Sequence, residues 1–519
     1  MTGAETSATP SYYITTPIYY VNDNPHIGHV YTTLACDVLA RFMRLDGRRV
    51  IFLTGTDEHG QKVEASARAR GLDPQRFTDE MSQNFHALSA AWQFSNDDFI
   101  RTTEPRHVRA CQALWQRLRE AGDIYLGSYA GWYAVRDEAF YGEEELTLAA
   151  DGVRYAPSGA PVAWVAEPSY FFRLSAWQER LLAYYRDNPE AIGPDGRRNE
   201  VLRFVESGLR DLSISRTTFA WGVPVPDDPD HIMYVWLDAL TNYLTALGYP
   251  DTDSESFRAF WPADLHMVGK DILRFHAVYW PAFLMAAGLA PPRRVFAHGW
   301  WTNEGQKISK SLGNVIDPYE LIDRYGLDQV RYFMLREVPF GNDGDFSHRA
   351  IVNRINDDLA NDFGNLAQRV LSMIHKNCAA AIPAPGDFTP ADDALLAAAD
   401  GLLARMREEL EVQAFHRALE AAWRVVGQAN RYVDEMAPWV LRKSDPARMA
   451  TVLYVLAEVI RQLAILVQPF MPNGPTRLLD QLGQPAEARD FAALAARLPA
   501  GRAIDKPQGI FPRYVEAES

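Results

Sequence analysis

Strand-like and helix-like segments alternate at the start of this chain, and this alternation restricts the fold more than any other feature. Residues Ser11–Val21 are rich in Tyr, Ile and Thr and predict a buried strand. A helical pattern runs from His29 to Gly47, a second apolar strand follows at Arg49–Thr54, and a helix follows near Lys62–Arg70. Such repeats predict an α/β domain with a doubly wound parallel sheet of the Rossmann type.

The 519 residues exceed what one ordinary core needs, so we expect several domains. A Tyr-, Trp- and acid-rich stretch interrupts the α/β pattern, and the chain is almost purely helical beyond Ile351, apart from a loop at Ile382–Pro390. The predicted domains are the first half of the α/β domain (1–125), a small inserted domain (126–222), the second half of the α/β domain (223–298), a loop and connecting region (299–350) and a helical bundle (351–519).

Composition excludes some classes of protein. We find no run of about 18 apolar residues and no secretory or transit signal, so we expect no membrane partner and a cytoplasmic location. The three cysteines, Cys36, Cys111 and Cys378, form no CxxC pair, which argues against disulfides and a cysteine-rich zinc site. The net charge of -15 speaks against general nucleic-acid binding but leaves room for a local basic face.

A first short motif, His26–His29 (HIGH), lies where the first strand passes into the first helix. Ligands bind at such junctions in parallel sheets, and the N–H groups of a helix amino terminus suit phosphate. Gly28 would let a flat base approach the backbone, while His26 and His29 could stabilise charge on phosphate oxygens. A four-residue motif also occurs by chance, so alone it predicts little.

A second motif, Lys307–Ser311 (KISKS), follows a predicted tight turn at Thr302–Gly305. Lysine acts as a point charge for phosphate, so Lys307 and Lys310 on a mobile loop could neutralise a triphosphate during displacement at phosphorus. By itself, a solvated basic loop would be an equally good explanation.

Together the two motifs resemble the paired signatures of class I aminoacyl-tRNA synthetases, whose second motif usually has Met where Ile308 stands. The resemblance implies in-line attack of an amino-acid carboxylate on the α-phosphorus of ATP, giving an aminoacyl-adenylate and pyrophosphate. It implies that His26, His29, Lys307 and Lys310 serve catalysis. The implied ATP-binding residues are His26, Gly28, His29, Asp271, Lys307, Ile308, Ser309 and Lys310.

Other segments resemble methionyl-tRNA synthetases, which implies L-methionine as the amino acid. By this resemblance Asp57 holds the substrate α-amino group, as expected for a carboxylate and an ammonium. Aromatic side chains suit a polarizable thioether, and Tyr20 and His276 could add polar contacts near sulfur. The implied methionine-binding residues are Ile18, Tyr20, Asp57, Trp236, Ala239, Leu240, Tyr243, Phe275 and His276.

The inserted segment departs from the family pattern in one respect. Many members carry a zinc knuckle opened by a CxxC pair, but Ala134 and Asp137 stand at these positions. Alanine cannot ligate a metal, so we predict no structural zinc and an insert held by ordinary packing. ATP and the Mg²⁺ that accompanies it are the expected cofactors, with no protein metal site.

The helical bundle also resembles the family, in which it reads the CAU anticodon. The resemblance makes it the anticodon-binding domain and tRNA(Met) a partner, with Asn365, Arg369 and Trp439 as the reading residues. Asn365 and Arg369 lie one helical turn apart, and Trp439 could stack on an unstacked base. No further carboxy-terminal module is recognisable, which favours a monomer.

Two other interpretations remain open. A non-catalytic relative that binds tRNA would usually show eroded motifs, whereas His26, Gly28, His29, Lys307 and Lys310 are all present. A class I synthetase for another amino acid is the other alternative. The valine, isoleucine and leucine enzymes carry a larger insert, and the cysteine enzyme holds its substrate on a zinc ion for which no ligand cluster is evident here.

Overall fold

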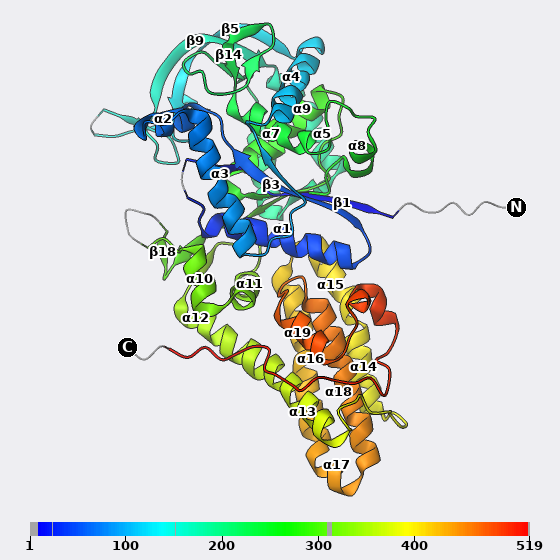
Figure 1. Cartoon of the computed structure of the whole chain (residues 1–519). Helices are drawn as coiled ribbons and strands as arrows, with labels where there is room; N and C mark the ends of the chain where they lie inside the picture. The colour runs from blue at the N-terminus through cyan, green and yellow to red at the C-terminus, as the bar shows by residue number, and fades with distance from the viewer. Residues whose placement is uncertain (1–8, 23, 151, 309–313, 517–519) are drawn as a thin grey trace, which may run out of the picture. The chain divides into compact units, whose positions relative to one another are not determined.

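The structure is a computed structural model that describes residues 9–22, 24–150, 152–308 and 314–516. The chain forms two compact units (Figure 1). We call residues Ser11–Pro25 and Ile51–Ala297 the sheet unit. We call residues Met1–Pro10, His26–Val50 and His298–Ser519 the helical unit, and describe each by itself.

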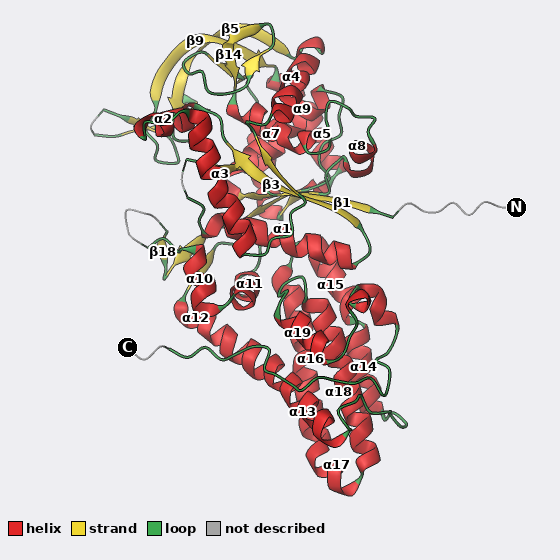
Figure 2. Ribbon diagram, in the orientation of Figure 1, coloured by secondary structure: helices red, strands yellow, loops and turns green. Residues whose placement is uncertain are grey.

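A seven-stranded sheet forms the centre of the sheet unit and confirms the predicted doubly wound fold (Figure 2). Its strand order is β10-β16-β15-β1-β3-β2, with β4 beside β3, and the pairs β1–β15, β2–β3, β3–β4 and β10–β16 are parallel. The strands are β1 (Ser11–Thr15), β2 (Tyr19–Tyr20), β3 (Arg49–Asp57), β4 (Asp98–Arg101), β10 (Ile192–Gly193), β15 (Leu265–Gly269) and β16 (Val295–His298).

Helices connect these strands, as parallel pairing requires. They are α2 (Gln61–Ala69), α3 (Pro74–Ala91), α4 (Pro105–Glu120), α7 (Val235–Thr245), α8 (Glu255–Phe260), the short segments η4 (Lys270–Ile272) and η5 (Phe275–Tyr279), and α9 (Trp280–Ala286). The predicted strand Ser11–Val21 is wrong as a single element, because it is interrupted between β1 and β2. Pro17 lies in the gap and has no N–H for a ladder, while the Thr16 hydroxyl donates to the Pro17 carbonyl oxygen at 2.8 Å.

The inserted region contains an antiparallel sheet of order β11-β9-β5-β6, in which β5 and β9 form the long curved pair in Figure 1. One part of it is not separate from the main sheet, because β10 pairs with β16. Its other elements are β5 (Ile124–Ala134), β6 (Ala139–Tyr141), η1 (Glu143–Glu145), β7 (Thr147–Leu148), β8 (Arg154–Tyr155), β9 (Ala163–Phe172), η2 (Leu174–Trp177), α5 (Gln178–Asp187), η3 (Pro189–Ala191), α6 (Asp195–Glu206), β11 (Leu212–Ser213), β12 (Ser215–Arg216), β13 (Pro224–Val225) and β14 (Asp228–Met233).

The helical unit begins with α1 and continues with a small sheet, of order β18-β17-β19, and the predicted helices (Figure 2). The predicted loop Ile382–Pro390 is confirmed up to α14, which begins at Pro390. The elements are α1 (Ile27–Leu45), β17 (Trp301–Asn303), β18 (Gln306–Lys307), α10 (Pro318–Tyr325), α11 (Leu327–Arg336), β19 (Gly344–Phe346), α12 (His348–Asn353), η7 (Arg354–Gly364), α13 (Asn365–Asn377), α14 (Pro390–Asp400), α15 (Leu402–Glu411), α16 (Phe415–Met436), α17 (Pro438–Ser444), α18 (Pro446–Val467), α19 (Gly474–Gln481), η8 (Ala486–Ala488) and η9 (Phe491–Ala495).

Helix α1 groups with the helical unit because it is anchored there by a buried ion pair. Asp37 Oδ2 lies 2.6 Å from Arg331 Nη2 of α11, and both side chains are fully buried. Arg331 also donates to the carbonyl oxygens of Pro469 and Phe470, so its charge is hydrogen-bonded as burial demands. This grouping differs from the five predicted domains, which placed α1 with the sheet.

Helix α18 is long and apolar enough to cross a membrane by length and composition. In this structure 94% of its apolar segment is buried inside the protein. It is therefore packed as the central helix of the bundle, whose other helices α14, α16, α17 and α19 contact it.

Candidate functional site

The predicted methionine-binding residues cluster where strands of the parallel sheet end. Asp57 is the last residue of β3, Ile18 and Tyr20 follow the end of β1, and Phe275 and His276 follow β15. Such carboxyl ends meet at one edge of a parallel sheet, where α/β proteins bind ligands. Helix α7 adds Trp236, Ala239, Leu240 and Tyr243, all buried except the half-buried Trp236.

Four of these residues form one aromatic wall. The rings of Trp236 and Phe275 stack face to face, with centroids 3.8 Å apart and an interplanar angle of 7°. The His276 ring meets Trp236 edge-on at 6.0 Å, and the Tyr243 hydroxyl lies 2.8 Å from His276 Nε2. A wall of ring faces and edges suits a flexible, polarizable side chain.

The polar atoms of His276 are already paired within the protein. Its Nδ1–H donates to the Ile272 carbonyl oxygen at 3.0 Å, so Nε2 is the acceptor for the Tyr243 hydroxyl. Burial lowers the pKa of His276 to about 4, so the ring is neutral at pH 7. The ring hydrogen of His276 is thus used within the protein, and the polar contact from His276 to a substrate sulfur stays a prediction.

Tyr20 is also committed to a protein partner. Its hydroxyl donates to Glu138 Oε1 at 2.5 Å and lies 3.0 Å from the carbonyl oxygen of His59. Burial and the nearby Glu138 carboxylate raise the pKa of Tyr20 well above its usual value, so the phenol keeps its proton. The hydroxyl hydrogen of Tyr20 is thus used within the protein, and the polar contact from Tyr20 to sulfur stays a prediction.

Asp57 differs from its neighbours because it has an unmet hydrogen-bonding need. The residue is buried, and its Oδ1 has no hydrogen-bond partner among the residues that the structure describes. Burial, with the nearby carboxylates of Asp238 and Glu138, raises the pKa of Asp57 well above its usual value. A buried carboxylate oxygen without a donor is costly, and an ammonium group from a ligand would supply both the donor and the charge.

A buried network lies on the other face of α7. Asp238 Oδ2 lies 2.6 Å from His59 Nδ1, and its Oδ1 lies 2.8 Å from His107 Nε2. Burial would raise the pKa of Asp238, but His59 and His107 hold it below the usual value. Within the described chain, His107, Cys111 and Asp238 also have ligand-type atoms within 4.8 Å of one another. These atoms hydrogen-bond with each other, so the network fixes α7 rather than resembling an open metal site.

The HIGH motif folds as a capping box in which both acceptors are histidine nitrogens. His26 is the N-cap of α1, and its Nδ1 accepts from the Gly28 N–H at 3.1 Å. His29 Nδ1 accepts from the His26 N–H at 3.0 Å, and the two rings are 3.9 Å apart. An acceptor at Nδ1 places the proton of each neutral ring on Nε2. Both Nε2–H groups are thereby donors, as binding of phosphate oxygens requires.

Two further features support this geometry. A Cβ on Gly28 would lie only 2.9 Å from His26 Cε1, so a side chain there would displace the ring. Removal from water and the neighbouring His26 ring hold the pKa of His29 well below its usual value, which keeps that imidazole neutral.

The turn before the KISKS motif is confirmed. Glu304 and Gly305 have positive φ (48° and 77°) and join β17 to β18, which contains Lys307. Asp345 Oδ1 fixes this turn by accepting from the Thr302 hydroxyl at 2.6 Å and the Gly305 N–H at 2.8 Å. Ile308 is half-buried, while Ser309 and Lys310 lie outside the described residues. Asp271 is exposed in η4, directly after β15.

Packing occupies the positions where a zinc knuckle would begin. Ala134 is fully buried and belongs to an apolar cluster with Ala156, Ala160 and Val162. Asp137 Oδ2 accepts from the Tyr141 hydroxyl at 2.9 Å and from the Ser158 hydroxyl. Ala134 offers no ligand atom, so this turn does not fit a zinc ion held by a CxxC pair.

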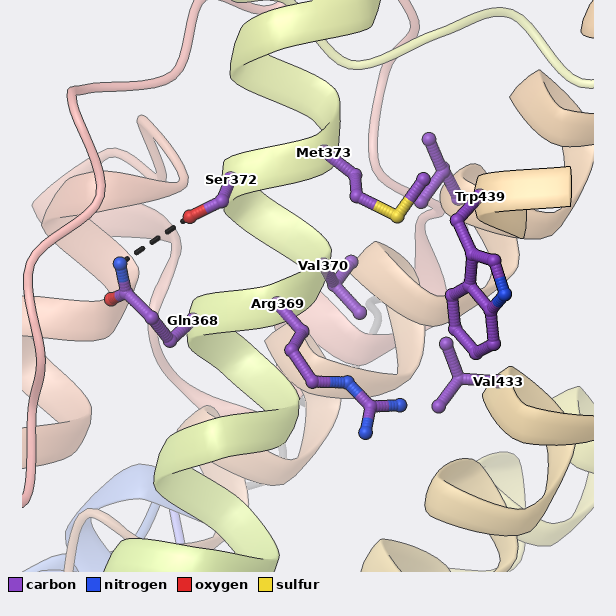
Figure 3. A pocket seen from close by; sticks show the side chains of 8 residues that line it. Gln368, Arg369, Val370, Ser372, Met373, Val433 and Trp439 are labelled. Carbon is purple, nitrogen blue, oxygen red and sulfur yellow. Dashed lines mark hydrogen bonds between the residues drawn. The ribbon is translucent and has the colours of Figure 1, made fainter. Parts of the chain in front are cut away.

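In the helical unit, an open pocket of about 520 Å³ lies between α13, α16, α17 and α18 (Figure 3). Trp439 is 47% exposed, and the Arg369 guanidinium lies 5.9 Å from the centre of its ring. Arg369 also pairs with Asp434 at 3.0 Å on the surface. The lining residues are Gln368, Arg369, Val370, Ser372, Met373, Val433, Trp439 and Leu453.

Asn365 and Arg369 lie one turn apart in α13, as the sequence predicts. Asn365 is exposed at the start of α13, but it does not line this pocket. Its side chain lies at 3.5 Å from Asn361 Oδ1. The structure therefore brings Arg369 and Trp439 together and leaves Asn365 beside them along the helix.

Comparisons with known proteins agree with both regions. Residues 12–371 match the family described as "tRNA synthetases class I (M)", and residues 382–519 match "Anticodon binding domain of methionyl tRNA ligase". The chain belongs to the class I methionyl-tRNA synthetases. Among its relatives, the methionine–tRNA ligase of Brucella suis is 60% identical over 508 residues, covering 98% of each chain.

Solved structures of the same family are also similar to this chain in sequence and in fold. The Mycobacterium tuberculosis methionyl-tRNA synthetase in complex with methionyl-adenylate has a TM-score of 0.95 and 56% identity, covering 97% of this chain and all of that one. The apo form of that synthetase gives a TM-score of 0.89 and 54% identity, covering 99% of this chain and all of that one.

Some residues of this synthetase site could not be found from motifs. Glu138 was visible only as part of the segment where the CxxC pair is lost, and its contact with Tyr20 spans 118 positions of sequence. Met373 and Val433 have apolar side chains on helices, and such side chains do not by themselves mark a binding residue. Only the pairing of distant segments reveals them.

Proposed function

We infer that this chain is a methionine–tRNA ligase. It activates L-methionine with ATP, giving methionyl-adenylate and pyrophosphate, and transfers methionine to tRNA(Met). The observation that carries this conclusion is the full-length relationship to methionine–tRNA ligases, together with the aromatic wall and a buried Asp57 carboxylate oxygen that has no hydrogen-bond partner among the described residues.

In the first step, a carboxylate oxygen of methionine attacks the α-phosphorus of ATP, and the bond to the bridging oxygen breaks as pyrophosphate leaves. Asp57 holds the ammonium group of methionine, and the ring faces hold its side chain. This positioning supplies most of the rate, because little covalent chemistry is asked of the protein. The proposed methionine-binding residues are Ile18, Tyr20, Asp57, Trp236, Ala239, Leu240, Tyr243, Phe275 and His276.

Charge on the phosphates is stabilised by two groups of donors. The Nε2–H groups of His26 and His29 bind phosphate oxygens, and Lys307 and Lys310 neutralise the charge that develops as pyrophosphate departs. Gly28, Asp271, Ile308 and Ser309 complete the proposed ATP site. Mg²⁺ arrives with ATP, and we propose no structural zinc, because Ala134 cannot ligate it.

The open pocket of the helical unit reads the anticodon. Trp439 stacks on a base, and Arg369 and Asn365 bond to exposed base or phosphate groups along α13. We further propose a monomer that acts in the cytoplasm without a membrane partner.

Amino-acid-dependent ATP–pyrophosphate exchange, run without tRNA across the standard amino acids, tests this function. We expect exchange with methionine alone. Exchange with a different amino acid would keep the synthetase but overturn the pocket. Absence of exchange both with and without tRNA would indicate a non-catalytic relative.

The role of the KISKS loop has its own test. Lys310→Ala should lower the adenylation rate by about 100-fold or more while methionine still binds, because the loop acts on the transition state. An unchanged rate would remove Lys310 from the mechanism. Zinc near one equivalent per chain in protein purified without added metal would contradict the proposed absence of structural zinc.

A further inference from the structure

The turn between β5 and β6 has an unusual backbone at Glu138. This residue has a φ of 49°, in the left-handed region that residues with a side chain rarely adopt. Such a conformation persists when the surroundings fix it, and it is common at functional sites. The strained residue lies next to Asp137, whose own side chain is held by the Tyr141 and Ser158 hydroxyls. These hydrogen bonds fix the Asp137 part of the turn, while the Glu138 side chain makes contacts with other segments.

Glu138 is buried, and its contacts reach three other segments of the sheet unit. Its Oε1 accepts from the Tyr20 hydroxyl at 2.5 Å, and its backbone carbonyl oxygen accepts from the Tyr234 hydroxyl at 3.0 Å. The backbone N–H of Lys62 also donates to its carboxylate. Tyr234 directly precedes α7, the helix that carries Trp236.

The chain leaves room for this contact at Gly60. A Cβ on Gly60 would lie 2.7 Å from Glu138 Oε1 and 2.8 Å from the Tyr20 hydroxyl oxygen. Gly60 also has a φ of 106°, which a side chain would disfavour. The absence of a side chain at Gly60 therefore permits Tyr20 and Glu138 to meet.

We propose that Glu138, in the inserted segment, is a positioning residue for methionine binding. Its side chain holds the Tyr20 ring in place at the methionine pocket. This role rests on the proposed function of Tyr20 in that pocket. The hydrogen bond consumes the one proton of the phenol, so Tyr20 offers a fixed apolar ring to the substrate. The turn that contains Asp137 and Glu138 is thereby connected to amino-acid binding.

The test is ATP–pyrophosphate exchange by the full chain, with methionine and ATP varied separately. Glu138→Ala should raise the KM for methionine about ten-fold, the effect expected for losing one hydrogen bond to a charged group. The KM for ATP and kcat should stay within about two-fold, because the contacts of Glu138 described above include none of the proposed ATP-binding residues. Glu138→Gln keeps an oxygen acceptor and should restore most of the affinity, with a KM about three-fold above that of the unmodified protein.

A double-mutant cycle identifies the path of the effect. Tyr20→Phe should raise the KM for methionine by a similar factor. The double variant Tyr20→Phe with Glu138→Ala should have a KM for methionine no higher than that of the more impaired single variant. The matched control is Glu144→Ala, which removes an exposed glutamate that pairs with Arg210 at 3.1 Å in the same insert. It should leave both KM values unchanged.

Specific outcomes would overturn the proposal. Equal rises in KM for methionine and ATP, additive effects in the cycle, or an unchanged KM for methionine would each show that Glu138 does not act through Tyr20. If Glu138→Ala does not fold, as judged by its thermal melting, Glu138→Gln decides between these results. Failure of this proposal can be distinguished from failure of the proposed function. In the second case the unmodified protein would show no exchange with methionine.

Discussion

The proposed methionine pocket and the proposed anticodon pocket each combine an aromatic ring with a nitrogen-containing side chain, but the two pairs differ in exposure. Around the first, Tyr243 and His276 are almost fully buried, and their polar atoms are paired with each other or with the backbone. At the second, Trp439 is about half exposed, and Arg369 lies over its ring and forms a surface ion pair with Asp434.

The difference reflects the two ligands. A small apolar side chain is selected by a pre-formed enclosure, where rigid rings lose little entropy on binding. Single-stranded RNA bases arrive from solvent and stack on an open platform. We expect changes in the buried pocket to have larger effects than changes at the exposed one, and four predictions test this ranking.

The largest effect should come from Asp57→Asn. This variant keeps the shape of the side chain but removes the charge that would pair with the methionine ammonium. Breaking a buried charge pair costs about 2–5 kcal/mol, so kcat/KM for methionine in pyrophosphate exchange should fall about 30-fold or more. Thermal stability should not fall, because the lost carboxylate was buried with one oxygen unpartnered.

The control for this change is Asp227→Asn. Asp227 lies in the same unit, with a side chain 76% exposed, and pairs with Arg119 at 3.3 Å. Its substitution should leave exchange unchanged. Normal methionine kinetics in Asp57→Asn would show that the ammonium binds elsewhere.

The second prediction concerns pH and the buried imidazole of the methionine pocket. His276 has a pKa of about 4 in the folded protein and about 6.5 when unfolded, so between these values the unfolded state binds more protons. Folding stability therefore falls as the pH drops from 6.5 to 4, by roughly 3 kcal/mol from this residue. His276→Gln lacks this dependence.

Urea unfolding of both proteins at pH 7, 5.5 and 4 measures the effect. The stability advantage of the unmodified protein over His276→Gln should shrink by roughly 3 kcal/mol across this range. Parallel pH curves would show that His276 is protonated in the folded state as readily as in the unfolded state. The residues that line the anticodon pocket include no histidine, so changes there should not alter the pH dependence.

The third prediction moves to the exposed pocket. Trp439→Ala should lower kcat/KM for tRNA in aminoacylation by about 10-fold to 100-fold, because stacking on one base contributes about 1–3 kcal/mol. Pyrophosphate exchange without tRNA should be unchanged. Trp439→Phe should retain most of the charging rate, since it keeps an aromatic face.

Val440→Ala is the matched control, because Val440 is the next residue and is 57% exposed. It should leave charging intact. If Trp439→Ala impaired exchange and charging equally, Trp439 would be structural rather than an RNA contact.

Motifs and periodicity predicted the architecture well because they are local. The turn at Glu304 and Gly305, helix α1 and the run of helices after Ile351 depend on near neighbours in sequence. The interruption at Pro17 was also readable, since proline cannot donate to a ladder, but the apolar run around it concealed the break.

The hydrogen-bond partners of the buried polar side chains could not be predicted from the sequence, because these bonds join distant segments. The sequence suggested that Tyr20 and His276 would offer polar contacts to sulfur. Within the protein their donors are used by Glu138 and Ile272. Likewise, nothing near Asp37 in the sequence indicated its ion pair with Arg331, 294 positions away, which anchors α1 in the helical unit.

The smallest effect should follow Asp434→Ala. The Asp434–Arg369 pair is exposed on both sides, and such pairs contribute about 0.2–1 kcal/mol to stability, so the melting temperature should change little. RNA must displace Asp434 from Arg369 to use the guanidinium, and the carboxylate also repels phosphate. Removing it should therefore lower the KM for tRNA, by about three-fold at most. A loss of charging as large as that of Trp439→Ala would instead mean that Asp434 itself contacts a base, and that the open pocket is as finely positioned as the buried one.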